Sequence, residues 1–221
     1  MQLLNWWMSG PGRSGPLSLF QAPKQLGHCL PDEISEWRDE ARPATAKQFE
    51  AAELAWQAYC SPTPEAWHAL MGAGCAIDLP ILQPTGWKLL AELPAAGSAL
   101  SHTQAHMLTL IWQGTTRPGD VFASLMDGSA VYSYWTLGRL LDDLATSEIP
   151  AVAGLRERPF SLALHDDAER FSNYRRSELQ VTDFGYALLN GEADFATSNR
   201  INRWWGGTHV TNENLWRLTL C

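Results

Sequence analysis

Hydrophobic side chains recur every three or four residues in several segments of the first half of the chain, which is the spacing of one helix face. The clearest stripe consists of Phe49, Ala52, Trp56 and Tyr59. Thr45 and Gln48 precede it as a capping box, in which each side chain bonds the other residue's backbone N–H. Further helices are expected over 32–42, from 63 onwards and over 79–93, each begun or ended by a proline.

The second half opens with the same helical spacing. Ser101 and Gln104 form another capping box, and Pro118 then begins a short helix through residue 126. Ser129 is expected to cap a longer helix. The apolar stripe on that helix consists of Val131, Tyr134, Leu137, Leu141 and Leu144.

Two strand-like runs follow, over 160–165 and 179–182, with a polar segment between them. Thr182 then caps a helix over 183–190 that Gly191 ends. Three helices followed by a two-stranded wing is the order of a winged helix.

The stretch from Ile201 to Val210 places two adjacent indoles, Trp204 and Trp205, before a pair of glycines. This composition predicts a tightly turned β-hairpin. One of the two indoles is expected to fill the core beneath it.

Together these patterns predict an α+β fold that is mostly α. Residues 1–30 form an irregular segment, 31–96 a helical array, and 97–221 a winged-helix-like domain that ends in a C-terminal β-hairpin.

Composition narrows the choice of partners. Of the 221 residues, 45% are hydrophobic and 18% are charged, which is enough for a real core and argues against disorder. The net charge of -8 opposes non-specific binding to nucleic acid or anionic lipid, unless a local basic patch overrides it. Most of the 11 tryptophans are expected to be core or interface anchors.

The four cysteines, Cys29, Cys60, Cys75 and Cys221, show no metal-ligand spacing such as CxxC. No secretory leader is recognisable, because the apolar start at 1–12 lacks a basic beginning and is broken by Pro11. No run approaches the ~20 apolar residues of a membrane helix. We therefore expect a cytoplasmic protein with reduced, buried thiols.

Two segments near the end, FGYALLNGEAD at 184–194 and INRWWGGTH at 201–209, resemble the C-terminal signature of a bacterial family. Its members carry the domain of unknown function eighteen thirty-five. Weaker matches lie at 2–4, 17–19, 100–104, 134–135 and 140–145. Trp205 and the ending at 216–218 depart from the family pattern, and the α/β domain usual upstream is absent. The family has no established reaction, so the resemblance implies shape rather than chemistry.

Three motifs suggest chemistry that their surroundings do not support. Residues 10–15 match GxGxxG, but they lack the preceding strand and following helix of a dinucleotide site, so a linker is favoured. His102 and His106 share a helix face without a third metal ligand nearby. The acidic pairs at 142–143 and 166–167, the second next to His165, fit a helix surface and a polar turn. We therefore predict no catalytic residue, no metal and no cofactor.

A DNA-binding interpretation follows from the winged-helix order. Its basic residues would be Arg139 on the recognition helix, with Arg170, Arg175 and Arg176 in the wing. This is a weak phosphate footprint, so a protein-binding use of the fold is favoured.

The terminal turn offers one ligand site. Arg203, the amides of Gly206 and Gly207, and His209 can surround a phosphate or carboxylate. The alternative is a packing device in which the glycines make the turn and Arg203 stacks on an indole. We favour packing.

The sequence thus favours a non-enzymatic, cytosolic interaction or regulatory module that binds another protein or forms a homo-oligomer. An exposed patch around Trp6 and Trp7 would support it. A winged-helix transcription regulator is the first alternative. A hydrolase or small anion sensor that uses Arg203 and His209 is the second.

Overall fold

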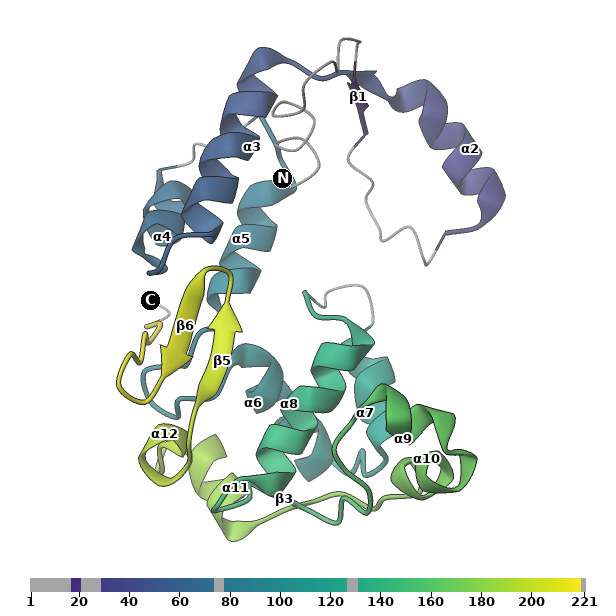
Figure 1. Cartoon of the computed structure of the whole chain (residues 1–221), viewed down its shortest axis with the longest axis vertical. Helices are drawn as coiled ribbons and strands as arrows, with labels where there is room; N and C mark the ends of the chain where they lie inside the picture. Colours follow the sequence, from purple (N-terminus) through teal and green to yellow (C-terminus); the bar gives the residue numbers. More distant parts are fainter. Residues whose placement is uncertain (1–16, 21–28, 74–77, 127–130, 220–221) are drawn as a thin grey trace. The chain divides into compact units, whose positions relative to one another are not determined.

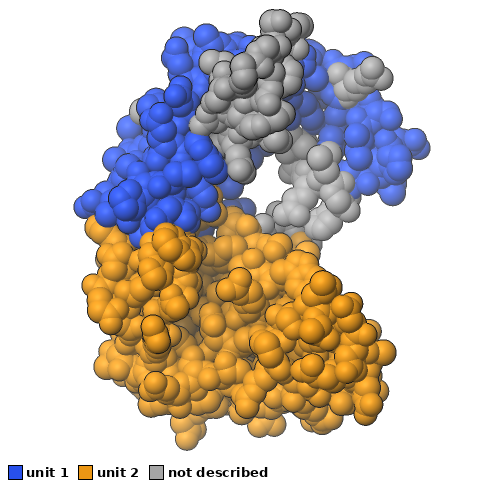
Figure 2. Space-filling model, viewed as in Figure 1, with its two compact units in different colours: residues 1–88, 206–208 blue, residues 89–205, 209–221 orange. Residues whose placement is uncertain are grey.

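The computed structural model describes residues 17–20, 29–73, 78–126 and 131–219. The chain divides into two compact units, residues 1–88 with 206–208 and residues 89–205 with 209–221 (Figure 2). The expected boundary at 96–97 comes a few residues after this division. The patch at Trp6 and Trp7 lies outside the described residues.

Unit 1 is a set of helices with one short antiparallel sheet (Figure 1). Its helices are α2 (Pro31–Glu40), α3 (Ala46–Tyr59), α4 (Glu65–Gly72) and α5 (Leu82–Leu90). Strand β1 (Ser18–Leu19) pairs with β2 (Arg42–Pro43). The predicted helical array is confirmed.

Local sequence signals explain these helices. The Thr45 hydroxyl accepts from the Gln48 amide at 3.2 Å, and the Gln48 side chain accepts from the Thr45 amide at 3.0 Å. Trp67 of α4 is fully buried, and its indole N–H donates to the carbonyl of Gly86 in α5 at 3.1 Å. Helices α3 and α4 pack together, and Ala52 and Ala55 of α3 are fully buried.

Unit 2 holds the remaining elements. They are α6 (His102–Trp112), α7 (Pro118–Leu125), α8 (Tyr134–Thr146), β3 (Val152–Ala153), α9 (Leu162–Asp166), α10 (Ala168–Arg175), β4 (Gln180–Val181), α11 (Asp183–Leu189), α12 (Phe195–Ser198), β5 (Asn202–Trp205) and β6 (Thr208–Thr211), of which Thr208 counts with unit 1. Such a content of helix with small sheets confirms an α+β fold that is mostly α.

The predicted starts of α6, α7 and α11 are confirmed. Ser101 and Gln104 form their capping box, and the Thr182 hydroxyl accepts from the Gly185 amide at 3.1 Å. Helix α8 starts later than predicted, at Tyr134, where Ser133 caps it. The expected cap, Ser129, lies outside the described residues.

The predicted strand over 160–165 is wrong. Ser161 caps helix α9 there, and Asp167 caps α10 by accepting from the amides of Glu169 and Arg170. The apolar residues Phe160, Leu162 and Leu164 alternate along this run and would share one face of a strand. Only Phe160 and Leu164 are buried, whereas Leu162 is exposed, so they do not form a buried sheet face. The predicted run at 179–182 does contain β4, which pairs antiparallel with β3 through Val152 opposite Val181.

The core of unit 2 joins α6, α7 and α8 to an aromatic cluster. Phe122, Tyr134, Phe160 and Tyr174 make edge-on or tilted ring contacts with centroids 5.1–5.9 Å apart. Gly138 lies beneath Phe160, and a Cβ at that position would stand 2.0 Å from the ring. The cluster attaches α9 and α10 to the three helices.

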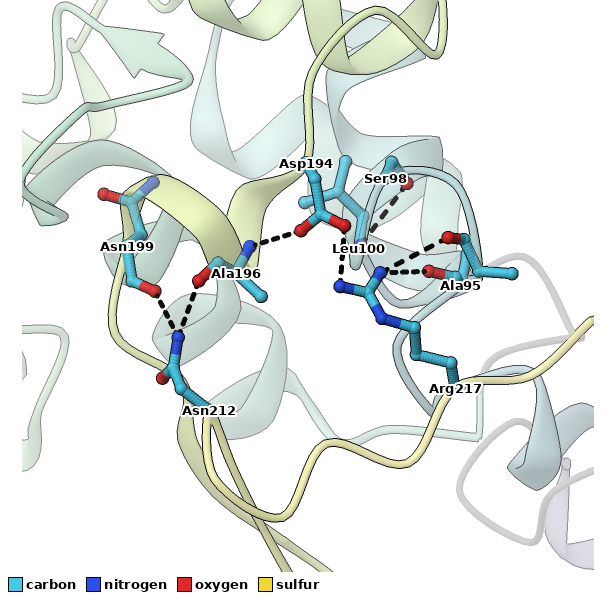
Figure 3. A network of polar contacts seen from close by, with 9 residues as sticks. Ala95, Ser98, Leu100, Asp194, Ala196, Asn199, Asn212 and Arg217 are labelled. Carbon is cyan, nitrogen blue, oxygen red and sulfur yellow. Dashed lines mark hydrogen bonds and ion pairs between the residues drawn. The ribbon is translucent and has the colours of Figure 1, made fainter.

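The predicted C-terminal hairpin is present as β5 and β6, which pair with each other around Gly206 and Gly207. The segment after it pairs with residues far back in the chain, through a parallel bridge between Leu218 and Ala95. In Figure 3, Arg217 reaches both the Asp194 carboxylate, at 2.6 Å, and the carbonyl of Ala95, at 3.2 Å. Asp194 also caps α12 through the amide of Ala196.

Candidate functional site

The terminal hairpin separates the residues of the predicted anion site onto its two faces. Trp205 is buried, with 5% of its surface exposed, whereas Trp204 is 68% exposed. Trp205 is therefore the indole that fills the core, and Trp204 is not. The indole N–H of Trp205 donates to the carbonyl of Leu89 at 2.7 Å.

Arg203 points inward with Trp205, but it does not stack on an indole as the packing interpretation expected. Its guanidinium donates to the side-chain oxygen of Gln104 at 3.1 Å and to the carbonyl of Glu92 at 3.3 Å. Burial lowers the pKa of Arg203, and the neighbouring Glu92 raises it in part. Arg203 thereby attaches β5 to the start of α6.

Gly206 and Gly207 are fixed by close backbone approach. Gly206 has φ of +54°, and a Cβ there would stand 2.2 Å from the carbonyl oxygen of Tyr59. The amide of Gly207 already donates to that same oxygen at 2.9 Å, and a Cβ at 207 would stand 2.0 Å from the carbonyl oxygen of Cys60. The turn is built for packing, because the amide of Gly207 is already used.

His209 lies on the outer face with Trp204, and the two rings stack with centroids 4.6 Å apart. Its Nε2 is 2.8 Å from the side-chain oxygen of Asn202. Arg203 and His209 line different hollows of unit 2. The four predicted ligand residues are therefore not brought together.

The four arginines of the DNA-binding alternative are also divided. Arg170 forms an ion pair with Glu157 at 3.1 Å, and Arg139 lies on α8. Arg175 and Arg176, at the end of α10, do share one cleft.

This cleft, which we call the basic cleft, has a volume of about 490 Å³. Its lining residues come from α7, α9 and α10 and from the residues beside these helices. Helix α10 packs against α7 and α9 (Figure 1). Its lining consists of Arg117, Gly119, Asp120, His165, Ala168, Phe171, Ser172, Arg175 and Arg176. Three arginines against one aspartate leave two net positive charges in the lining if His165 is neutral.

The arginine side chains of the basic cleft form few interactions with the described residues. Arg176 donates to the hydroxyl of Ser172 at 2.5 Å. The guanidinium groups of Arg117 and Arg175 form no hydrogen bond or ion pair with any residue that the structure describes. Burial raises the pKa of Tyr134, and the charge of Arg175 lowers it in part.

His165 forms the aromatic wall of the basic cleft. Its Nδ1 lies 3.0 Å from the carbonyl oxygen of Ser161, and its Nε2 lies 3.0 Å from the hydroxyl of Tyr134. Because a carbonyl oxygen only accepts, Nδ1 is the donor, and Nε2 of the neutral ring accepts from Tyr134. Phe171 packs on the ring with centroids 4.2 Å apart. The wall is therefore rigid.

Sequence reasoning missed Arg117 and misjudged His165. Arg117 is far from Arg175 in sequence, and only the packing of α7 on α10 unites them. His165 was assigned to a strand end beside Asp166. The sequence signal for its position is that it lies among the aromatic residues between Phe160 and Tyr174.

The histidine pair and the acidic pairs considered in the sequence analysis do not assemble into a site. His102 and His106 lie with ring centroids 6.2 Å apart, and no cluster of three or more potential metal ligands occurs among the described residues. Asp142 is buried and accepts from the amide of Phe160, whereas Asp143 is exposed. The GxGxxG segment at 10–15 lies outside the described residues.

The described thiols are not buried as expected. Cys60 is exposed, and Cys29 is intermediate in exposure. Cys75 and Cys221 lie outside the described part of the chain. None of the described helices combines the length and apolarity that a bilayer crossing requires.

The resemblance to the bacterial family stays a prediction. Comparison with family models, with curated proteins and with solved structures finds no match for this chain.

Proposed function

We propose that the protein is a binding module whose basic cleft takes up a small phosphate-bearing ligand. The observation that carries this proposal is the convergence of Arg117, Arg175 and Arg176 from two separate elements onto one hollow. Arginine offers several N–H donors in a planar fork that matches phosphate oxygens, and charge-assisted bonds of this kind are the strong ones.

Local charge supports the same conclusion. The chain carries a net charge of -8, yet the lining of this cleft is positive. A positive hollow on an acidic protein attracts a compact anion while the remaining surface repels long polyanions. Its volume of about 490 Å³ falls in the usual range for small-molecule sites, about 300–1,000 Å³.

A small ligand is favoured over DNA because the four arginines of the DNA-binding alternative do not lie together on one surface. Arg170 is engaged by Glu157, and Arg139 does not line the cleft. Duplex recognition uses a basic stripe that follows the phosphate backbone. Arg175 and Arg176 at the end of α10 form a compact cluster with Arg117, which directly precedes α7.

Calorimetric titration of the full chain at low salt tests this proposal, with pyrophosphate, ATP and a 20-base-pair duplex as probes. We expect pyrophosphate or ATP to bind and the duplex to bind more weakly. R175Q combined with R176Q should weaken binding by about tenfold or more, because each charged hydrogen bond contributes roughly 1.5–3 kcal/mol. R139Q is the matched control and should leave binding unchanged.

Three results would contradict the proposal. They are no binding of either small phosphate, equal weakening by R139Q, and tight duplex binding in the absence of pyrophosphate and ATP binding. A circular-dichroism melt of each variant confirms that the fold is retained.

A second function, protein–protein interaction, is favoured by exposed tryptophans in unit 2. Trp112, Trp135 and Trp204 expose 57%, 43% and 68% of their surfaces. Tryptophan is enriched among the residues that dominate interface energies. Light scattering across protein concentrations, with pull-down, tests this function. W204S should weaken any association found, and a monomer at all concentrations without a captured partner would remove it.

A further inference from the structure

A second, smaller cavity in unit 2 lies beside the hairpin strand β5. Its volume is about 190 Å³. The lining residues are Ala99, Gln104, Asp143, Phe195, Arg200, Ile201, Asn202 and Arg203. None of these residues lines the basic cleft, so the two sites are independent.

Two arginines, Arg200 and Arg203, line this cavity. Arg203 is held in place by its bonds to the Gln104 side chain and the Glu92 carbonyl. A guanidinium has five N–H groups, so these two bonds leave three for other acceptors. Arg200 is exposed at the rim and contributes a second positive charge.

The holding groups are themselves fixed. The buried Glu92 carboxylate accepts from the hydroxyl of Thr103 at 2.5 Å and from its amide at 3.3 Å. The Gln104 side chain also accepts from the amide of Ser101 at 3.1 Å. Arg203 therefore needs no rearrangement to meet a ligand, which reduces the ordering cost of binding.

The cavity also has a negative charge, from Asp143 of α8. Loss of hydration raises the pKa of this carboxyl, and the charges of Arg203 and Arg139 lower it in part. Within the described ranges, however, no ion pair joins Asp143 to Arg203 or Arg200. The lining thus presents opposite charges that do not neutralise one another by direct contact.

We propose that this cavity binds a small zwitterion, a free α-amino acid with a short side chain. The carboxylate of the ligand accepts from the guanidinium groups of Arg203 and Arg200, and its ammonium group donates to Asp143. Arginine suits carboxylates because its N–H groups can form paired bonds to both oxygens. Ala99, Phe195 and Ile201 supply the apolar wall for the side chain.

Size sets the limit on the ligand. At about 190 Å³ the cavity is smaller than the usual small-molecule site of about 300–1,000 Å³. This favours a compact ligand such as alanine over a large amino acid.

Nuclear magnetic resonance titration of the full chain tests this inference with three probes: alanine, propionate and ethylamine. Propionate and ethylamine each keep one charge of alanine and lack the other. We expect alanine to shift the amide signals of 199–203 and to bind at least about tenfold more tightly than either probe, since each loses one charged hydrogen-bonding group.

Substitutions in the cavity test which residue binds the carboxylate and which binds the ammonium group of the ligand. R200Q and D143N, both at exposed positions, should each weaken alanine binding by about tenfold or more. R156Q, an exposed arginine outside this cavity, should leave it unchanged. The inference is overturned if alanine does not bind, if propionate binds as tightly as alanine, or if R200Q and D143N both bind alanine normally.

Discussion

The two adjacent indoles of β5 allow a test of which tryptophan supports the fold. Trp205 exposes 5% of its surface and Trp204 exposes 68%, although they are neighbours in sequence and identical in chemistry. Replacing each with alanine changes the composition equally, so a difference in stability reports the difference in burial and in the contacts that each indole makes. Trp204→Ala is thus the matched control for Trp205→Ala.

The expected cost follows from the buried area. A buried tryptophan removes about 200 Å² from water, which at roughly 25 cal/mol per Å² corresponds to about 5 kcal/mol as an upper value. Large core truncations of this kind cost about 3–5 kcal/mol. Trp205 also loses its 2.7 Å bond to the Leu89 carbonyl. We expect Trp204→Ala to cost about 1 kcal/mol or less, because only its stacking on His209 is lost.

Urea unfolding followed by far-ultraviolet circular dichroism measures both variants without depending on tryptophan emission. If Trp205→Ala prevents folding, Trp205→Phe keeps an aromatic ring and should cost about 1–3 kcal/mol, since part of the packing and the N–H donor are lost. Equal costs at the two positions, or a larger cost at Trp204, would refute the assignment of the buried indole.

Three further predictions test other parts of the structure. Gly206→Ala should cost about 2 kcal/mol or more of stability in thermal melts, because φ is +54° and the new Cβ meets a carbonyl oxygen. Gly97→Ala is the control, since there is open space around Gly97, and its change in stability should stay within about 0.5 kcal/mol. A double-mutant cycle between Asp194 and Arg217 should give a coupling of about 1 kcal/mol that falls with added salt; zero coupling would contradict the ion pair. Burial raises the pKa of Asp142, so the folded state keeps this proton to higher pH than the unfolded state. The free energy of unfolding of the wild type, relative to that of Asp142→Asn, should therefore fall as the pH rises above about 4 in urea titrations. A rise in this difference with pH would contradict the raised pKa.

Local signals in the sequence were sufficient for most helix starts. The boxes at Thr45 and Ser101 and the cap at Thr182 depend only on residues three positions apart, so no tertiary information is needed to find them. The glycine pair likewise located the hairpin, because the turn geometry is encoded within a few residues.

The failures have a common physical cause, which is that long-range packing decided the outcome. Residues 160–165 alternate like a strand, yet Phe160 is held against Phe122 and Gly138, and the chain after it forms a helical turn. The choice between Trp204 and Trp205 depended on which face of β5 meets the core. A one-residue shift in a strand exchanges its faces, and the sequence of this hairpin does not specify which applies.

The arrangement of β3 and β4 has a consequence for motion. Residues 154–179, which carry α9 and α10, begin and end beside this two-residue ladder, so any opening of them as one segment must break the ring contacts of Phe160 with Phe122 and Tyr134. Arg175 and Arg176 lie on this segment, and Arg117 lies outside it. An anion held by both sides must dissociate before the segment opens, so hydrogen exchange at the α10 amides should slow by the factor 1 + [ligand]/Kd while exchange in α6 is unchanged.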